Sequence, residues 1–368
     1  TLVYFKDKEY FTKHREEFRL PDTEEGFENP DNDPRGPWKA DPFQVEGIRK
    51  NQLYPITNPN TGKVYYPNEG NSWKNEFNKF QELYADNRIV FGKTGEGGPQ
   101  RKRFLFEAKE RGRVSKTLWA DIETTSNGTN RIKKLFGDTV FSNPKPVQLL
   151  ERIIQLGGNK DGIVLDFFSG SATTAEAVLK MNKEDGGNRK FILVQLPENL
   201  DESLKTSSKD AQKVLKKAIK YLDKINRPHY LTEIGEERIR LAINDLGLSQ
   251  DPKVGFKVFK LTETNFKKWD KNPNNLKEQI ELFTNPFKEN ATLDGILYEL
   301  ALKHGLKPNF KVEKIRNNEV TLNNINEGEL LVVLDDKIST SSFEGIEEKI
   351  NENTIIILND NGFDTDND

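Results

Sequence analysis

Apolar residues recur along the chain with two periods, one typical of helices and one typical of strands. Helical spacing is found at 72–86, 147–156, 209–226 and 231–246. Short apolar runs bounded by turn-forming residues predict strands at 88–91, 163–166 and 191–195. The glycine-rich and basic segment 92–103 is expected to form a loop.

From Gly255 onward, short strands and helices alternate, which predicts a second, smaller α/β domain. Strands are expected at 255–261, 308–315, 330–335 and 354–358, and helices at 274–284, 293–303 and 343–351. Asp335 and Asp336 stand at a strand end, as the carboxylates of a nuclease do. No matching carboxylate cluster accompanies them, which favours a structural role.

The segment from Gly162 to Leu196 predicts a strand, a tight turn, a helix and a second strand. The first strand ends in Asp166, and the turn that follows is built of small residues that let a ligand approach the backbone. Thr173 and Thr174 are placed to cap the helix, whose positive end suits a carboxylate. Taken alone, this segment is equally compatible with an ordinary strand-to-helix turn.

The segment 21–72 is rich in Pro, Asn, Asp and Gly, with aromatic residues interleaved. Its turn chemistry predicts short strands and ordered loops. A disordered segment would not hold so many aromatic side chains, so an ordered recognition module is favoured over an irregular insertion or a linker.

Composition narrows the chemistry. Because the chain has no cysteine, a disulfide scaffold, a thiolate metal site and a cysteine nucleophile are excluded, and a reducing cytoplasm suits it. The three histidines, His14, His229 and His304, lie too far apart in sequence to suggest a metal cluster. No apolar run has the length of a membrane span.

The net charge of −3 hides an uneven distribution. Residues 100–134 hold ten basic and four acidic residues, a local excess of six positive charges. This segment is interpreted either as a phosphate-contacting surface or as a solvated helix face. The neighbouring GKTGEGG sequence at 92–98 lacks the spacing of a phosphate-binding P-loop, which favours a mobile loop.

The turn after Asp166 resembles the cofactor loop of S-adenosylmethionine-dependent DNA amino-methyltransferases, which usually reads DxFxGSGTT, with Ala172 in place of the second glycine. The Asn143-Pro144-Lys145-Pro146 sequence lies a short helix upstream, as in that class. The resemblance extends to the modification subunits of type III restriction-modification systems. Its further carriers are Asn32 to Trp38, Tyr54-Pro55-Ile56, Pro59 to Gly62, Trp73, Phe141-Ser142 and Asn188 to Gln195.

This resemblance implies a site-specific, adenine-N6 DNA methyltransferase that uses S-adenosyl-L-methionine. The implied cofactor residues are Asn143, Lys145, Pro146, Asp166, Phe167, Phe168, Ser169, Gly170, Ser171, Thr173, Thr174 and Gln195. The implied DNA-binding residues, taken from the basic stretch and the aromatic module, are Arg35, Trp38, Lys39, Arg101, Lys102, Arg103, Arg111, Arg113 and Lys116. The implied partners are double-stranded DNA, a second modification subunit and a restriction (helicase-nuclease) subunit.

The implied fold is α/β: a Rossmann-like methyltransferase fold with a partial sheet, an inserted target-recognition region and a smaller C-terminal α/β domain. Residues 1–20 would end the catalytic half, 21–138 would recognise the DNA target, and 139–250 would form the cofactor-binding half. Residues 251–368 would form the C-terminal domain and make dimer or partner contacts.

The sequence departs from the family pattern at one decisive point. Such enzymes need an Asp-Pro-Pro-Tyr tetrapeptide that holds the target amine and stacks on the flipped base, and this chain has no Pro-Pro dipeptide. Asp41-Pro42-Phe43 lacks the second proline, so no catalytic residue is assigned. The chain is therefore expected to begin after that motif and to be inactive alone. The strand around Val164 should then have an unpaired edge and partly uncovered apolar faces.

Two other functions stay open from the residues. The chain is alternatively a non-catalytic DNA-binding or assembly subunit, a remnant that contributes recognition only. A methyltransferase for RNA or a small molecule is a weaker alternative, which the segment Asn32 to Trp38 and the basic stretch disfavour.

Overall fold

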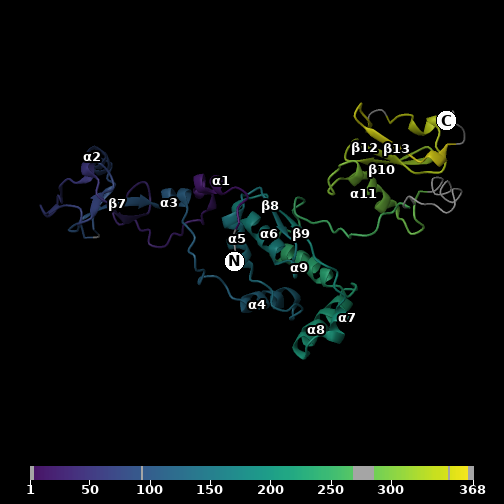
Figure 1. Cartoon of the computed structure of the whole chain (residues 1–368), viewed down its shortest axis with the longest axis horizontal. Helices are drawn as coiled ribbons and strands as arrows, with labels where there is room; N and C mark the ends of the chain where they lie inside the picture. Colours follow the sequence, from purple (N-terminus) through teal and green to yellow (C-terminus); the bar gives the residue numbers. More distant parts are fainter. Residues whose placement is uncertain (1–3, 93, 268–285, 347–348, 364–368) are drawn as a thin grey trace. The chain divides into compact units, whose positions relative to one another are not determined.

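The structure, a computed structural model, describes residues 4–92, 94–267, 286–346 and 349–363. It is a mixed α/β protein with two compact units, Thr1–Val254 and Gly255–Asp368 (Figure 1). Each unit contains its own clusters of buried apolar residues. Within the described residues, no helix has the length and apolar character needed to cross a membrane.

Unit 1 begins with a short helical hairpin, α1 (Lys8–Lys13) and the 3-10 turn η1 (Arg15–Phe18). Three small sheets follow. The largest pairs β1 (Trp38–Pro42), β7 (Pro99–Phe104) and β6 (Ile89–Phe91) in that antiparallel order. The two others pair β2 (Gln44–Glu46) with β5 (Asn71–Trp73), and β3 (Ile56–Thr57) with β4 (Val64–Tyr65). The 3-10 turn η2 (Lys50–Gln52) lies between them.

The aromatic residues of this region form a core of their own. Trp73 and Phe43 are fully buried, and helix α2 (Phe77–Ala85) packs Phe80 against them. The indole of Trp73 donates a hydrogen bond to the Tyr54 carbonyl at 2.7 Å. The segment 21–72 is therefore an ordered module and not a linker, as its aromatic content predicts.

Helix α3 (Leu105–Arg111) leads to the second half of unit 1. Its helices are α4 (Thr125–Phe136), α5 (Val147–Gly157), α6 (Thr173–Asp185), α7 (Leu200–Thr206), α8 (Lys209–Lys224) and α9 (Leu231–Asp245). Strands β8 (Ile163–Asp166) and β9 (Lys190–Leu193) pair in parallel on either side of α6 in the chain. The predicted strand, turn, helix and strand are thus present.

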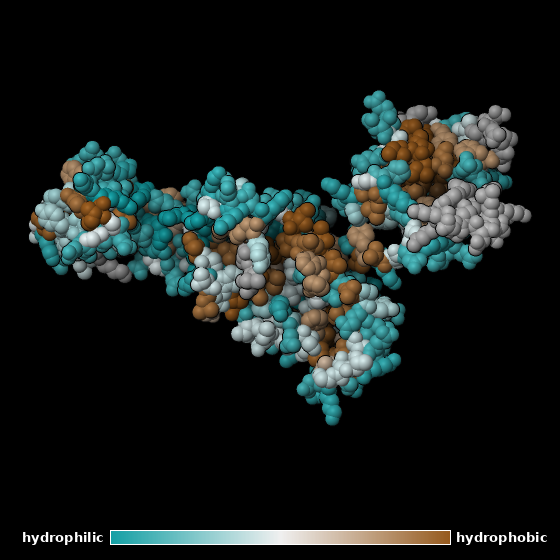
Figure 2. Space-filling model, in the orientation of Figure 1, coloured by the Kyte–Doolittle hydropathy of each residue, from teal (hydrophilic) through white to brown (hydrophobic). Residues whose placement is uncertain are grey.

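Among the described residues, the β8–β9 sheet is covered on one face only. Val164 and Phe191 pack against the cluster of α5 and α6 that contains Val178 and Met181. On the opposite face, Leu165 is 58% exposed and its cross-strand partner Ile192 is 51% exposed. Hydrophobic residues gather on the surface where β8 and β9 lie (Figure 2). The expected unpaired edge and uncovered apolar face are therefore seen within the described residues.

Unit 2 combines helix α11 (Leu293–Lys303) with a four-stranded sheet. Its order is β10 (Val312–Asn317), β11 (Val320–Ile325), β12 (Leu330–Val333) and β13 (Ile355–Leu358). The first three strands pair antiparallel, whereas β12 and β13 are parallel. The 3-10 turns η3 (Thr340–Phe343) and η5 (Asp360–Gly362) flank β13.

Several predicted elements need correction. Residues 99–104 form strand β7 instead of continuing a loop, and 255–261 form no strand. Helix α7 and strand β11 are present but were not expected. The described part of 343–351 contains no α-helix, and the helix predicted at 274–284 lies outside the described residues.

Candidate cofactor and DNA-binding site

The turn after β8 is held in shape by two side chains at the ends of the strands. The Asp166 carboxylate accepts hydrogen bonds from the Phe168 amide at 3.2 Å and from the Thr174 hydroxyl at 2.5 Å. Beyond β9, the Gln195 side-chain carbonyl accepts from the Gly170 amide at 2.8 Å. Both residues lie at the carboxyl edge of a parallel sheet, where ligands bind in open α/β folds.

The Asn143 to Pro146 sequence lies close to this turn. Gly170 has a φ of +51°, and a Cβ atom there would come within 3.2 Å of the Phe141 ring, two residues before Asn143. Gly128 of α4 lets the Pro144 backbone approach so closely that a Cβ atom would lie 2.3 Å from its carbonyl oxygen. The fold thus packs Phe141, two residues before the Asn143 to Pro146 sequence, against the turn.

The start of helix α6 differs from the expectation. Its N-cap is Ala172, in the left-handed conformation with a φ of +59°, and no side chain caps the helix. Thr173 and Thr174 do not cap it because their hydroxyls bond to Arg238 and Asp166. The positive end of α6 is therefore without a side-chain cap.

The predicted cofactor residues divide into an accessible crest and a buried base. Phe168 is 82% exposed, Phe167 is exposed, and Ser169 and Gly170 are half-buried. Asn143 and Lys145 are exposed, whereas Pro146 is buried at the start of α5. The base, which consists of Ser171, Thr173 and Thr174, is buried, so these three side chains shape the loop from within.

The residue beneath this base, Arg238, is not among the predicted site residues. Arg238 of α9 is fully buried and donates hydrogen bonds to the Ser171 hydroxyl at 2.7 Å and to the Thr173 hydroxyl at 2.6 Å. It also donates to Glu176 of α6 at 2.9 Å. A signal existed in the sequence, because Arg238 lies four residues from both Ile234 and Ala242, on the apolar side of its helix.

Burial lowers the pKa of Arg238, while the Glu176 carboxylate opposes that effect and favours the charged guanidinium. Glu176 is itself buried and also accepts from Arg131 at 2.5 Å. Arg131, which lies in the basic stretch, pairs further with Asp245 at 2.7 Å. This part of the basic stretch is therefore used inside the protein.

Several predicted DNA-binding residues also have acidic partners within the same part of unit 1. Lys102 is fully buried between Asp31 and Asp33, so it offers no surface to a phosphate. Arg35 pairs with Asp33 at 2.9 Å and with Asp86 at 3.0 Å. The hydrogen bond from Arg35 holds the pKa of Asp33 well below its ordinary value.

Trp38 and Arg103 belong to the same ionic arrangement. The Trp38 indole donates to Asp31 at 2.8 Å, and its ring lies 4.9 Å from the Lys102 ammonium. Arg103 lies 3.2 Å from the Asp41 carboxylate. These contacts bind β1 and β7 to the preceding loop, which is a structural role.

The other predicted DNA-binding residues are exposed or half-buried. Arg111 and Lys116 are exposed, while Arg101, Arg113 and Lys39 are half-buried. The Lys39 ammonium lies over the Phe27 ring at 4.4 Å. These five residues are the accessible remainder of the predicted surface.

Comparisons with known proteins show the family of this chain. Residues 1–244 match the family model described as DNA methylase. The chain belongs to this family. The resemblance to type III modification subunits is confirmed by the similar relatives. The chain is 41% identical over 169 residues to the Mod subunit of the type III restriction-modification enzyme StyLTI of Salmonella typhimurium, covering 45% of this chain and 25% of that protein.

Two further relatives are similar. The Mod subunit of the type III enzyme EcoPI of Escherichia phage P1 is 34% identical over 146 residues, which cover 39% of this chain and 20% of that subunit. The type II methyltransferase M.KpnI of Klebsiella pneumoniae is 33% identical over 168 residues, which cover 40% of this chain and 38% of that protein. The chain thus spans well under half the length of these relatives.

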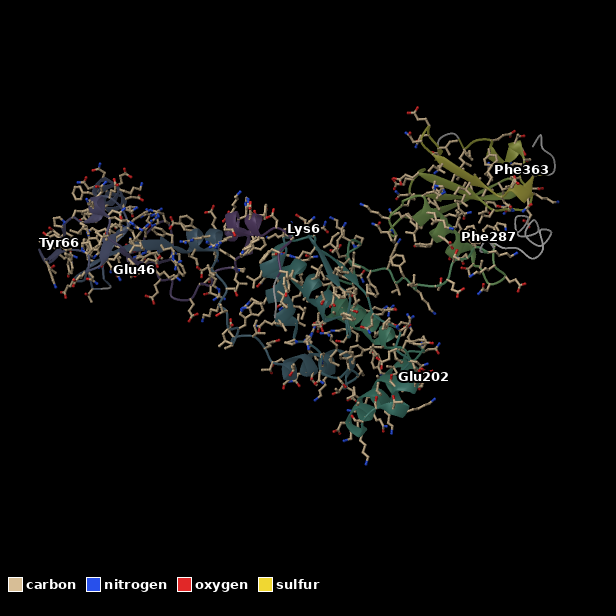
Figure 3. All side chains as sticks on the ribbon, viewed as in Figure 1. Lys6, Glu46, Tyr66, Glu202, Phe287 and Phe363 are labelled. Atoms are coloured by element: carbon tan, nitrogen blue, oxygen red, sulfur yellow. The ribbon has the colours of Figure 1, made fainter. Side chains whose placement is uncertain are left out.

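This member of the DNA methylase family has a polar cleft in the module formed by its small N-terminal sheets. The cleft measures about 800 Å³, and its lining includes Gln44, Asn71 and Gln100 together with Gly97 and Gly98. Glu46, labelled in Figure 3, also lines it. The buried Asn58 amide donates to the Gly95 and Gly97 carbonyls at 3.0 and 3.1 Å, so the wall is anchored and differs from the mobile loop expected at 92–98.

Proposed function

We propose that this chain supplies cofactor binding and target recognition to a site-specific DNA adenine-N6 methyltransferase of the type III modification kind. The observation that carries the proposal is the loop from Asp166 to Thr174 at the carboxyl end of β8, with the ring of Phe141, which leads into the Asn143 to Pro146 sequence, packed against it. Both motifs lie in the part of the chain that matches the DNA methylase family.

The proposed cofactor is S-adenosyl-L-methionine, which supplies an electrophilic methyl group when bound. Three observations support the fit. The turn has an exposed crest at Phe167 and Phe168, the missing side chain of Gly170 lets the Phe141 ring approach the turn, and α6 lacks a side-chain cap. Asp166 and Gln195 would hold the turn open toward the ligand, while Ser171, Thr173 and Thr174 would set its backbone.

The proposed DNA-binding surface is narrower than the sequence suggested. Arg101, Arg111, Arg113, Lys116 and Lys39 would contact phosphates, because arginine and lysine neutralise the backbone of DNA. The four residues with acidic partners or full burial are left out of this surface, namely Arg35, Trp38, Lys102 and Arg103.

Base reading is proposed for the cleft of the recognition module. Glutamine and asparagine side chains pair with two edge atoms of adenine at once, and glutamate accepts from the amine of cytosine. Gln44, Asn71, Gln100 and Glu46 line one cleft, which supports a base-reading role.

The transfer step itself would need residues that this chain does not hold. The chain has no Pro-Pro dipeptide, so no Asp-Pro-Pro-Tyr is present to hold an adenine amine. We propose that a catalytic half carrying this tetrapeptide covers the apolar face of Leu165 and Ile192 and completes a Rossmann-like sheet. Methyl transfer by this chain alone is expected to be absent.

The proposed division of labour follows the chain. Residues 21–138 would form the target-recognition region, 139–250 the cofactor half, and 251–368 a domain for dimer or partner contacts, with 1–20 ending the catalytic half. Double-stranded DNA, a second modification subunit and a restriction subunit are the proposed partners.

Calorimetry with S-adenosylhomocysteine, the methyl-free product, tests the cofactor site. The unmodified chain is expected to bind it, and Asp166→Ala is expected to weaken binding at least about tenfold, since the variant loses both bonds that shape the turn. Asp161→Ala is the matched control, because Asp161 is an exposed aspartate just before the same strand. Absence of binding by the unmodified chain would refute the proposal.

A further inference from the structure

The buried guanidinium of Arg238 does more than fill the core. One of its nitrogens, Nη1, reaches the Ser171 hydroxyl at 2.7 Å, the Thr173 hydroxyl at 2.6 Å and the Ser171 carbonyl at 3.3 Å. Its Nε donates to the Glu176 carboxylate at 2.9 Å. A single side chain of α9 therefore forms hydrogen bonds both to the loop after β8 and to the start of helix α6.

Stability alone does not account for a charged group at this place. Removing a guanidinium and a carboxylate from water costs several kcal/mol for each ion, of order the attraction they regain, and apolar residues of similar size often serve equally well. What arginine adds is a rigid, planar fork that fixes several acceptors at once. At Arg238 those acceptors include two hydroxyls of the turn.

The turn itself needs outside support. Gly170 and Ala172 both have positive φ angles, and Ser171 lies between them. A left-handed alanine costs about 1–2 kcal/mol, so this conformation persists only where neighbours hold it. Helix α9 packs directly on the turn at Gly235, where a Cβ would lie in ordinary contact with the Gly170 carbonyl at 3.5 Å and the Ala172 methyl at 3.7 Å.

We propose that Arg238 is a positioning residue for the cofactor: from α9 it locks the Ser171 and Thr173 hydroxyls and so keeps the crest of the turn in its ligand-binding shape. The Glu176 carboxylate on α6 holds the Arg238 guanidinium in place. Glu176 also accepts a hydrogen bond from Arg131, which in turn pairs with Asp245. This inference rests on the proposed cofactor function and adds a residue that does not touch the ligand.

The first test compares Arg238→Lys with Arg240→Lys. Lysine keeps the charge beside Glu176 but lacks the fork, so it cannot hold Glu176 and both hydroxyls together. Arg240 lies two residues away on the same helix and pairs with Glu236 and Glu237 of that helix. S-adenosylhomocysteine is titrated by calorimetry, and hydrogen exchange of residues 168–174 is followed without ligand.

In Arg238→Lys, affinity for S-adenosylhomocysteine is expected to fall about tenfold or more, and exchange at the amides of the turn to accelerate by a similar factor. The thermal midpoint should fall by only a few degrees. If Arg238 merely supported the core, the substitution would lower the midpoint by more than that. Arg240→Lys should match the unmodified chain. Unchanged exchange and affinity in Arg238→Lys would overturn the inference.

A second variant removes the acceptors instead of the donor. Ser171→Ala with Thr173→Val deletes both hydroxyls and leaves the pairing of Arg238 with Glu176 intact, so it serves even where Arg238→Lys fails to fold. It is expected to reproduce the loss of affinity, and adding Arg238→Lys to it should cost little more. Fully additive losses would overturn the inference. Absence of binding by the unmodified chain would instead overturn the proposed function, while loop exchange still decides whether Arg238 fixes the turn.

Discussion

At the scale of single residues, Ala172 shows that only very small side chains fit the turn after β8. It is buried, it has a φ of +59°, and it replaces a glycine of the family pattern. Relative to glycine, its left-handed conformation destabilises the folded state by about 1–2 kcal/mol. Burial of its methyl group stabilises the folded state by about 0.8 kcal/mol, and the smaller conformational freedom of alanine in the unfolded state adds about 0.4–1 kcal/mol. These contributions nearly cancel, which explains how alanine is accommodated.

We therefore expect Ala172→Gly to change the free energy of unfolding by less than about 1 kcal/mol. Ala172→Val should lower the free energy of unfolding by about 3 kcal/mol. Its branched side chain is too large for this buried position and strongly disfavours a positive φ. Urea unfolding of the two variants beside the unmodified chain measures both values. A valine variant as stable as the alanine chain would show that the turn leaves the left-handed conformation in solution.

At the scale of elements, the sequence predicted those whose partners are close in the chain. The strand, turn, helix and strand around Asp166 and helix α11 follow from local periodicity alone. Strand β7 escaped prediction because its basic side chains resemble an exposed loop. Lys102 is buried there only because Asp31 and Asp33, about 70 positions earlier, fold onto it. The role of Arg238 likewise depends on a contact between distant segments.

The helical hairpin α7–α8 contains a titratable link. His229 has Nδ1 2.9 Å from the Asp201 carboxylate of α7 and Nε2 2.9 Å from the Asp223 carboxylate of α8. Asp201 lies next to Glu202, labelled in Figure 3. The hydrogen bonds to Asp201 and then to Asp223 raise the pKa of His229 above its ordinary value of 6.5.

A raised pKa in the folded protein means that the link stabilises fully below about pH 6.5, the pKa of an unfolded histidine. The stabilisation is lost as the pH rises through the higher folded pKa. His229→Gln should therefore lower the free energy of unfolding by about 1 kcal/mol or less at pH 6, since the pair is partly exposed, and by almost nothing at pH 9. Urea titrations at the two pH values measure this difference.

His304→Gln is the control for that experiment, because His304 is an exposed histidine in the other unit. It measures how far replacing an exposed histidine by glutamine changes the free energy of unfolding at each pH. A larger effect of His229→Gln at pH 9 than at pH 6 would contradict the proposed link.

At the scale of the whole molecule, the two faces of the β8–β9 sheet have opposite surroundings although they belong to the same four-residue strands. Val164 and Phe191 pair across the strands and face α5 and α6. The next pair along the strands, Leu165 and Ile192, faces outward, and each of the two residues is more than half exposed. A contiguous exposed apolar patch on a sheet with open edges favours association between molecules.

The two neighbouring pairs therefore allow a matched experiment on the 368-residue chain. Changing Leu165 and Ile192 to threonine should reduce binding of a hydrophobic dye and self-association in sedimentation several-fold, while the free energy of unfolding changes by less than about 1 kcal/mol, since little burial is lost. Changing Val164 and Phe191 to threonine should instead lower the free energy of unfolding by about 3 kcal/mol or more, because both pack against the cluster that contains Val178 and Met181. This second variant should leave the outward patch in place. Equal losses of stability from the two pairs would mean that the outward face is already covered within this chain. That result would remove the structural reason for expecting a catalytic half to bind there.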